Sequence, residues 1–384
     1  MPSPRPRIVL IAALTVALLL PARAAFAFGD VSSSYWDYAS IKYVASTHDY
    51  MSDYGTSFKP TTIEQRKFLA RALVKAYRPA EPVDSSIKFT DLPSTDPFYR
   101  YANVATKLRW LPKFPDGSWR PTATATVRGL DRALILAMGL SSQVRGLARI
   151  HEADGDVYKV GSFFPYIQLA HWLGLHYNHS TESADILSTS LLRRDEMAFT
   201  LSHAKQISSW KLSSAWRFSN VTLPSLNPAD PTQAAKRKLT EYALNQVGYP
   251  YIWGGEWPTR SPSGYCCGYQ PQGGFDCSGF VWWVTKKYEG GYNAAQFRSY
   301  AGWSLPQRAS YQMAGATSTK ISYANLKVGN LMFFGSSSGV NHVALYVGNN
   351  WMMSSSGSVD GPVLEWVGSG WWRDHFKFGR SLKS

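Results

Sequence analysis

Residues 248–284 read GYPYIWGGEWPTRSPSGYCCGYQPQGGFDCSGFVWWV, and Cys277 stands where the glycine-rich part gives way to a helical pattern. Phe280, Val281 and Val284 recur at helical spacing behind it. A thiol at a helix N-terminus lies beside unpaired N–H groups and the positive end of the helix dipole, and both lower its pKa and favour the nucleophilic thiolate. We therefore predict that Cys277 is a reactive cysteine rather than a buried, inert one.

A candidate partner for this thiol follows downstream. Residues 340–350 read VNHVALYVGNN and alternate as a strand does, with His342 on the face opposite the three large aliphatic residues. The asparagine pair that ends this run is typical of a hairpin turn into a second strand. Because an imidazole on a neighbouring strand can take the proton of a thiol at a helix start, we predict Cys277 as nucleophile and His342 as base.

Four motifs in this order, YIWGG, FDCSGF, LKVGNLMFF and NHVALYVGN, resemble the NlpC family of papain-like cell-wall cysteine peptidases over residues 232–384. The resemblance implies an α+β fold with a small antiparallel sheet and no metal or organic cofactor. It also implies hydrolysis of peptidoglycan stem peptides, commonly at the bond from the D-glutamate side chain to the diamino acid. By position, the residues expected beside the nucleophile and in contact with substrate are Tyr251, Asp276 and Ser278.

The chain departs from the family pattern at three places. The third polar residue, most often His and twelve positions after the catalytic His, is Ser354 here. A hydroxyl can bond an imidazole N–H but orients the ring less firmly than a second imidazole. The usual G-D-L is G-N-L, with Asn330 in place of Asp, and residues 256–272 form an insertion. These changes bear on rate and substrate more than on the fold.

The insertion contains the adjacent Cys266 and Cys267, for which several interpretations stay open. They could form a strained disulfide with each other, remain unpaired, or bridge two chains. A zinc site shared with Cys277 lacks the usual ligand spacing. We favour a structural or redox-protecting role.

The first 27 residues are typical of a signal peptide. Two arginines precede an apolar run over residues 8–20, and Ala25-Phe26-Ala27 fits a cleavage site. The run is too short for an ordinary spanning helix, although an uncleaved anchor is the alternative. No later segment is apolar enough to span a bilayer, so we expect an exported protein at the cell wall or surface of a bacterium.

Charge and composition agree with this destination. The chain has 384 residues, which suggests two or three domains, and a formal net charge of +14, half of it in residues 232–384. A basic balance suits an anionic wall, and no nucleic-acid motif is present. With only three cysteines, the chain is not a disulfide scaffold. The chain has 15 tryptophans, and five in the basic C-terminal part are as consistent with core or rim packing as with stacking on glycan: Trp253, Trp257, Trp303, Trp371 and Trp372.

Residues 28–207 contain an internal repeat. FGDV at 28–31 recurs as FTDL at 89–92, and SFKP at 57–60 recurs as SWRP at 118–121, both offset by 61 positions. In each unit, an apolar-periodic helix lies between the two recurring motifs, and a second helix follows the proline of the second motif. The second helices are predicted over 64–77 and 127–138, and a diverged third unit has its helices near 166–175 and 192–204.

This pattern resembles three S-layer homology repeats, mainly α-helical, over 28–80, 87–140 and 148–207. A linker or partly ordered connector over 208–231 and an amphipathic helix over 232–247 would follow. The resemblance implies binding to an anionic secondary cell-wall polymer. The arginines near the starts of the second helices, expected to bind it through fork-like hydrogen bonds, are Arg66, Arg128 and Arg194. The alternative is that they are merely solvated first-turn residues.

The leading hypothesis is a secreted, wall-attached cysteine endopeptidase acting on peptidoglycan peptides through Cys277 and His342. One alternative, suggested by Ser354 and Asn330, is a non-catalytic wall-binding protein with a decayed peptidase domain. Another is a papain-like hydrolase or acyltransferase with a different amide or ester substrate, because a fold does not fix a substrate.

Overall fold

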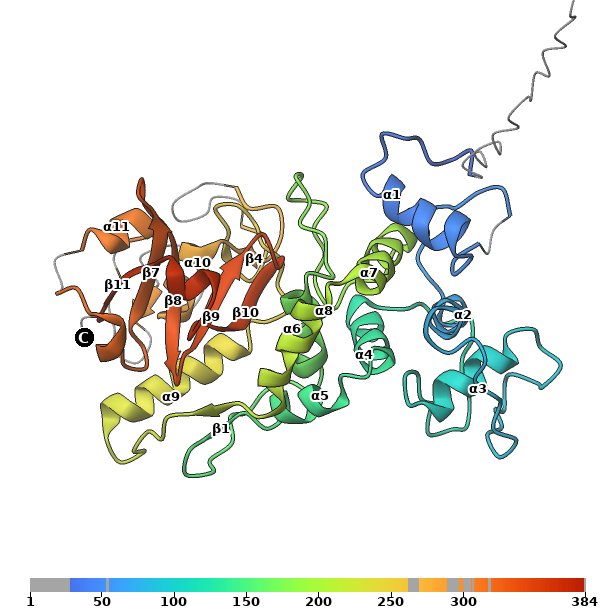
Figure 1. The fold of residues 1–384 in the computed structure, drawn as a ribbon, viewed down its shortest axis with the longest axis horizontal. Coiled ribbons are helices and arrows are strands. Elements are labelled where there is room, and N and C mark those ends of the chain that lie inside the picture. Colours follow the sequence, from blue (N-terminus) through green and yellow to red (C-terminus); the bar gives the residue numbers. More distant parts are fainter. Residues whose placement is uncertain are drawn as a thin grey trace, which may run out of the picture.

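The protein is an elongated molecule with a β-sheet half at one end and helical units extending away from it (Figure 1). The computed structural model describes residues 28–52, 55–261, 269–288, 297–299, 305, 307–316 and 319–382. The predicted signal peptide and the pair Cys266 and Cys267 lie outside these residues. Within the described ranges, no helix is long and apolar enough to cross a membrane.

Two helical units at the N-terminal end follow the repeat that the sequence predicts. In the first, the carboxylate of Asp30 accepts hydrogen bonds from the N–H groups of residues 58 and 59, at 2.8 and 2.7 Å. In the second, Asp91 accepts from residues 119 and 120, both at 2.7 Å. The two aspartates therefore stabilise equivalent turns that lie 61 positions apart in the sequence. The helices of these units are α1 (Tyr38–Ile41), continued by a π-helix (Lys42–Thr47), α2 (Arg66–Tyr77), α3 (Tyr99–Lys107) and α4 (Val127–Ala137).

A third helical unit contains α5 (Ser141–Leu147), α6 (Phe164–Leu173) and α7 (Arg194–Gln206). The residues that lead into α2, α4 and α7 pair with one another through short bridges. The bridges are Ile63 with Arg193, Gln65 with Thr124, and Thr126 with Leu191. The three units therefore meet at one centre, where their second helices begin.

The segment predicted as a linker over 208–231 is folded, which corrects that prediction. It contains α8 (Ser209–Ser214), a 3₁₀-helix (Ala215–Ser219) and β2 (Thr222–Leu223), which pairs in parallel with β1 (His151–Glu152). Phe218, Val221 and Leu223 are fully buried. Burial of these apolar side chains holds the segment against the third unit. The Ser, Asn and Pro content of the segment nevertheless resembles that of a flexible connector.

The C-terminal half is built on a five-stranded antiparallel sheet of order β10-β9-β8-β7-β11. This is the small antiparallel sheet that the sequence resemblance implies. Its strands are β7 (Leu331–Ser336), β8 (Gly339–Gly348), β9 (Trp351–Ser356), β10 (Gly361–Trp366) and β11 (Phe376–Arg380). The smaller elements are α9 (Pro231–Leu244), β3 (Glu256–Trp257), β4 (Gly274–Phe275), α10 (Cys277–Val284), β5 (Lys286–Tyr288), β6 (Phe297–Ser299), α11 (Ser310–Ala314) and α12 (Trp371–Asp374).

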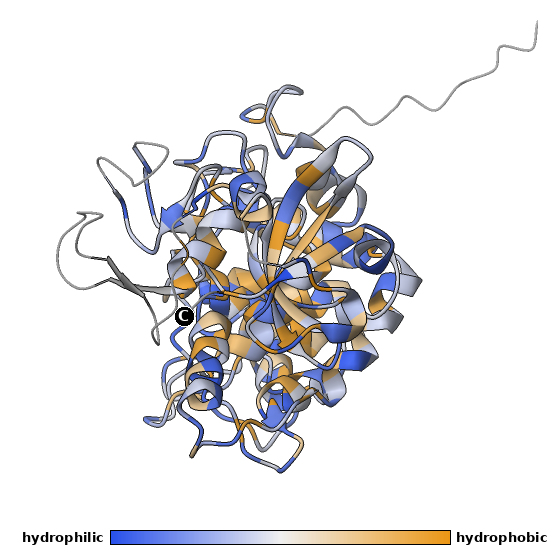
Figure 2. Cartoon of the chain, turned by 90° about the vertical axis from the view of Figure 1, so that its left-hand side faces the viewer, coloured by the Kyte–Doolittle hydropathy of each residue, from blue (hydrophilic) through white to orange (hydrophobic). Residues whose placement is uncertain are grey.

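Strand β8 has the alternation predicted from its sequence. Val343, Leu345 and Val347 belong to the main core, on which α10 packs, and Ala344 and Tyr346 belong to a smaller cluster. The asparagines at 349 and 350 have φ of 48° and 63°, the left-handed pair that a tight hairpin turn into β9 requires. Viewed towards this half, hydrophobic residues gather in the central strands and helices (Figure 2).

The third helical unit and the sheet are joined by buried polar contacts. The side-chain amide of Gln168 on α6 donates to the carbonyl of Leu364 at 2.9 Å and accepts from its N–H at 2.8 Å. This amide therefore occupies the open edge of β10 as a neighbouring strand would. His171 Nδ1 lies 3.0 Å from the carbonyl of Val359. Because Gln168 and His171 are buried, this interface is packed like a domain interior.

Candidate active site

Cys277 is the first residue of α10, as the sequence predicts. Asp276 caps this helix by accepting from the N–H of Gly279 at 2.5 Å. Gly279 has to be glycine, since a Cβ there would clash with the carbonyl of Gly255. The Cys277 thiol takes hydrogen bonds from the backbone at Ser278 and Val343, so it lies against β8 at the residue that follows His342.

His342 is held by Ser354 from the adjacent strand β9. The His342 Nε2 atom and the Ser354 hydroxyl are 2.7 Å apart, and Ser354 is fully buried. The ring centroid of Trp372 lies 4.9 Å from that of His342. One ring nitrogen is thereby engaged by Ser354, which leaves Nδ1 as the atom that can serve the thiol. Among the described residues, no direct hydrogen bond joins the thiol and the ring.

Burial keeps both members of this pair neutral. It raises the pKa of the Cys277 thiol to about 11, with the Asp276 carboxylate adding to the shift. Burial also lowers the pKa of His342 to about 4. The prediction of a thiolate favoured by the helix start is therefore wrong for this resting geometry, because the cost of desolvating the charge exceeds the stabilisation by helix N–H groups.

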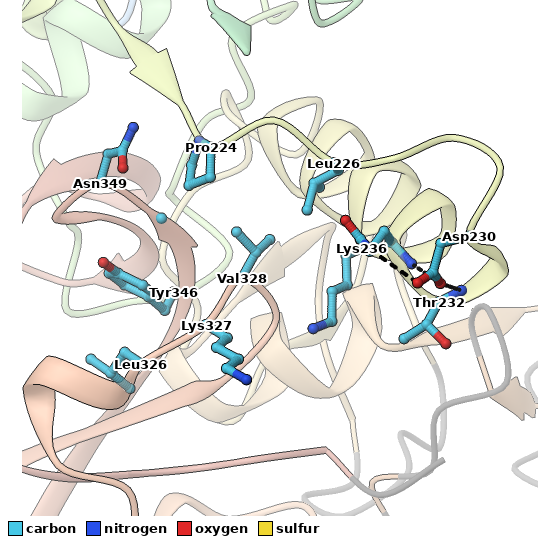
Figure 3. Close-up of a pocket in the computed structure, with 12 residues that line it drawn as sticks. Pro224, Leu226, Asp230, Thr232, Lys236, Leu326, Lys327, Val328, Tyr346 and Asn349 are labelled. Carbon is cyan, nitrogen blue, oxygen red and sulfur yellow. Dashed lines mark hydrogen bonds between the residues drawn. The ribbon is translucent and has the colours of Figure 1, made fainter. Parts of the chain in front are cut away.

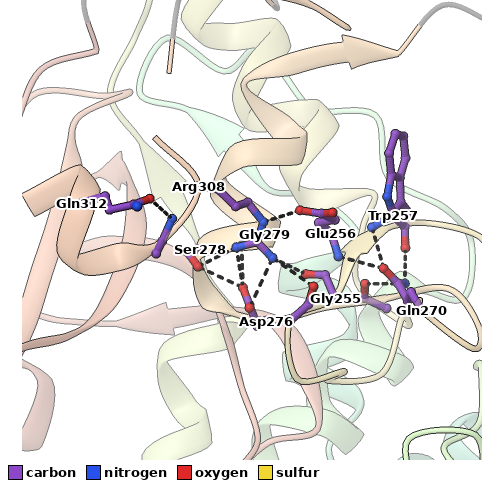
Figure 4. Close-up of polar contacts among 12 residues, drawn as sticks. Gly255, Glu256, Trp257, Gln270, Asp276, Ser278, Gly279, Arg308 and Gln312 are labelled. Carbon is purple, nitrogen blue, oxygen red and sulfur yellow. Dashed lines mark hydrogen bonds and ion pairs between the residues drawn. The ribbon is translucent and has the colours of Figure 1, made fainter. Parts of the chain in front are cut away.

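Arg308 organises the loops around the nucleophile (Figure 4). Its guanidinium pairs with Glu256 at 2.5 Å and with Asp276 at 3.2 Å, and it donates to the Ser278 hydroxyl at 2.7 Å. It also donates to the carbonyls of residues 254 and 255, both at 3.2 Å. Arg308 is not among the site residues predicted from the sequence. The available signal was indirect, since buried carboxylates such as Glu256 need a cationic partner.

The three predicted substrate contacts are placed differently from one another. Tyr251 lies beside the nucleophile, since burial and then the Cys277 thiol raise the pKa of its hydroxyl. Asp276 and Ser278 are turned towards Arg308 instead, and Ser278 is buried. Their visible role is therefore to hold the helix start in place.

The three predicted polymer-binding arginines also differ. Arg194 is fully buried, pairs with Glu64 at 2.9 Å and donates to two backbone carbonyls, so its guanidinium is not presented to a ligand. Arg66 and Arg128 are half-buried, and each lies over an aromatic ring, that of Trp119 and of Phe163 respectively. Helices α2 and α7 begin at Arg66 and Arg194, whereas Arg128 is the second residue of α4.

Asn330, a departure from the family pattern, has a local structural role. Its side-chain oxygen accepts from the N–H of Lys327 at 2.7 Å and closes the turn before β7. Among the described residues, its side chain has no hydrogen bond to the site around Cys277. Of the tryptophans singled out in the sequence, Trp257 is buried, Trp253 and Trp371 are exposed and Trp372 packs on His342. Trp303 lies outside the described residues.

A pocket of about 650 Å³ opens beside His342, at the seam between the two halves of the chain. Its lining combines residues of α6 and α8 with residues of the sheet half: Trp172, Leu173, Gly174, Lys211, Asn341, His342, Ser356, Ser358, Val359, Glu365, Trp371 and Trp372. Another pocket of about 620 Å³ lies away from this site, between the start of α9 and the β8–β9 turn (Figure 3). Its carboxylate, Asp230, caps α9 by accepting from the N–H groups of Thr232 and Gln233.

Comparison with known proteins agrees with this geometry. Residues 248–380 match the model of the NlpC/P60 family, so the C-terminal half contains an NlpC/P60 domain. The chain is 38% identical over 142 residues to the bifunctional muramidase/DL-endopeptidase CwlT of Bacillus subtilis strain 168, covering 36% of this chain and 34% of that protein. It is 34% identical over 139 residues to the probable endopeptidase p60 of Listeria monocytogenes, covering 36% and 22%.

Each match covers about a third of this chain, and the chain spans about a third or less of the length of these two relatives. Among solved structures, the P60 domain of a Mycobacterium avium paratuberculosis antigen is 25% identical, with a TM-score of 0.30, covering 40% of this chain and 98% of that chain.

Proposed function

We propose that this protein is a secreted cysteine endopeptidase that hydrolyses peptidoglycan stem peptides, at the bond from the D-glutamate side chain to the diamino acid. The observation that carries the proposal is the placement of Cys277 at the start of α10 and against β8, where His342 is held by Ser354. These residues fall inside the region that matches the NlpC/P60 family. The names of the related endopeptidases support the substrate class.

The mechanism starts from a neutral thiol and a neutral imidazole. As the Cys277 sulfur attacks the amide carbonyl, Nδ1 of His342 takes the thiol proton. The Cys277 backbone N–H stabilises the developing oxyanion. His342 then donates the proton to the leaving amine, which departs and leaves a thioester. Water, deprotonated by His342, attacks this thioester and releases the acid and the free thiol.

The test is mass spectrometry of defined muropeptides incubated with the mature protein. We expect two new fragments that correspond to cleavage before the diamino acid, and none with Cys277→Ala. Intact muropeptides after incubation with folded wild-type protein that still sediments with cell walls would reject the peptidase. That outcome would favour the non-catalytic wall-binding alternative. Labelling Cys277 with a thiol reagent would not separate the peptidase from the wall-binding alternative. Burial raises the pKa of this thiol whether or not the site is catalytic.

We further propose that residues 28–207 act as S-layer homology repeats and hold the enzyme on an anionic secondary wall polymer. Arg66 and Arg128 are the candidate contacts, since both are half-buried side chains near the start of a second helix. The double variant Arg66→Ala/Arg128→Ala should sediment less with purified walls than the wild type does. Unchanged sedimentation would remove these arginines from the proposal.

A further inference from the structure

The pocket beside His342 continues along the seam into a second pocket of about 300 Å³. The two share five lining residues, which define what we call the seam groove: Trp172, Lys211, Glu365, Trp371 and Trp372. Trp172 lies at the end of α6 and Lys211 on α8, whereas the other three come from β10 and α12. Neither half of the chain therefore forms this groove alone.

The groove holds a carboxylate that is only partly satisfied. Glu365 is 6% exposed, and the side chain of Trp372 hydrogen-bonds to it. Its second oxygen, Oε2, is buried and has no hydrogen-bond partner within the described part of the chain. A buried carboxylate oxygen without a partner is costly, and burial accordingly raises the pKa of Glu365 to about 7. Glu365 lines both pockets, so an ammonium group bound in the groove would offset the charge of this carboxylate.

A positive charge lies in the same groove without neutralising this carboxylate directly. Lys211 Nζ is 3.9 Å from the centre of the Trp172 ring, a cation–π contact, and burial lowers its pKa. Lys211 and Glu365 attract each other electrostatically. No ion pair within 4.0 Å joins them among the residues that the structure describes. The groove thus presents a separated cation and anion, between which a zwitterionic group fits.

The position of the groove assigns it to one side of the scissile bond. The larger of the two pockets that share these residues is also lined by His342, but not by Cys277, Tyr251 or Asp276. In the proposed mechanism His342 gives its proton to the leaving amine, so the residue that carries this amine lies on the His342 side of the thiol. A side chain of that residue can reach the groove.

We propose that the seam groove binds the leaving-group residue of the substrate through a side chain that ends in both an ammonium and a carboxylate. Glu365 accepts from the ammonium, Lys211 donates to the carboxylate, and the tryptophans cover the aliphatic part. A diaminodicarboxylic acid has such a side chain, whereas lysine offers only the ammonium. This inference rests on the proposed peptidase function. It makes α6 and α8 part of the specificity site rather than a passive tether.

The inference is tested by binding to the full chain carrying Cys277→Ala, so that no peptide is turned over. Isothermal titration calorimetry compares two γ-D-glutamyl tripeptides that end in meso-diaminopimelate or in L-lysine. We expect about tenfold tighter binding of the diaminopimelate peptide, the value of one charge-assisted hydrogen bond. Adding Lys211→Met should abolish the preference, and Lys211→Arg should keep it. Glu365→Gln should weaken both peptides by a similar factor.

Lys238→Met is the matched control, because Lys238 is exposed on α9 and outside the groove. It should leave both affinities unchanged. Equal affinities of the two peptides, no binding of either, or a preference that survives Lys211→Met would overturn the inference. Turnover of the same two peptides by the wild type shows whether the groove assignment or the proposed peptidase function has failed. Cleavage of both at equal rates rejects the groove assignment alone, whereas a binding preference without any cleavage rejects the peptidase alone.

Discussion

Ser354 is the residue on which the orientation of His342 depends. Its hydroxyl lies 2.7 Å from Nε2, and it is fully buried, so water cannot substitute for it. We expect Ser354→Ala to lower kcat/KM about tenfold, the value of one hydrogen bond of about 1.4 kcal/mol, with little change in KM. Steady-state kinetics on a soluble stem peptide measure this. The exposed Ser338→Ala is the control, and an unchanged kcat/KM for Ser354→Ala would show that the ring is oriented without it.

The pH dependence follows from the burial of His342. The ring must be neutral to accept the thiol proton, and burial lowers its pKa to about 4. Ser354 and the rings of Phe334 and Trp372, which lie against it, carry no charge that would raise this value. We expect kcat/KM to fall on the acid side with a midpoint near pH 4. A midpoint near 6.5, the ordinary histidine value, would mean that the ring is solvated in the working enzyme.

The same shift affects stability, with a definite sign. The unfolded ring takes up a proton near pH 6.5, whereas the folded ring does so only near pH 4. Protonation therefore favours the unfolded state in this window. The contribution of His342 to stability is present above pH 6.5 and is lost as the pH falls towards 4.

Site residues that belong to a local sequence pattern could be predicted from the sequence, whereas those that act on distant partners could not. Cys277, His342 and Ser354 were placed from strand alternation, a helix start and the family spacing, and the structure brings the three elements that carry them together. Arg308 and Lys211 act on residues at least 30 positions away, so no local pattern marks them. The pKa of Cys277 was predicted in the wrong direction because burial does not show in sequence spacing.

Helix α6 shows how one element can stabilise another through a single amide. Gln168 makes two hydrogen bonds to the backbone of Leu364 at the edge of β10. Gln168→Leu leaves that N–H and carbonyl buried without partners, and we expect a loss of about 1–3 kcal/mol in the free energy of unfolding. Denaturant unfolding measures it. Gln143→Leu is the control, because the side chain of Gln143 accepts a hydrogen bond from the exposed hydroxyl of the neighbouring Ser142. A loss no larger than that of the control would mean that α6 does not protect this edge.

The secondary structure was predicted well wherever apolar spacing or turn residues were strong. The helix predicted over 127–138 is α4 (Val127–Ala137), and the hairpin predicted at the asparagine pair joins β8 to β9. The segment over 208–231 was misjudged, because its polar composition hid the few apolar residues, such as Phe218, that fold it onto the third unit. Such contacts depend on the tertiary structure and leave little trace in local composition.

Across the whole molecule, the third helical unit and the sheet half share one apolar core. A chain that begins at residue 208 would lose α6 and with it the cover of β10. We expect this shortened chain to unfold at a lower temperature and to self-associate, because an uncovered edge strand pairs with other chains. Thermal unfolding and size-exclusion chromatography of residues 208–384 against the mature chain measure both effects. A monomeric shortened chain with unchanged thermal stability would show that the sheet half is independent.

The central claim is that Cys277 forms a covalent bond with a peptidoglycan peptide. It is tested most directly by intact-protein mass spectrometry after acid quenching of a reaction with a defined stem peptide. We predict a mass increase equal to the acyl fragment, located on the segment that contains Cys277 and absent from Cys277→Ala. Cleavage products formed without this adduct, and equally by Cys277→Ala, would contradict the account.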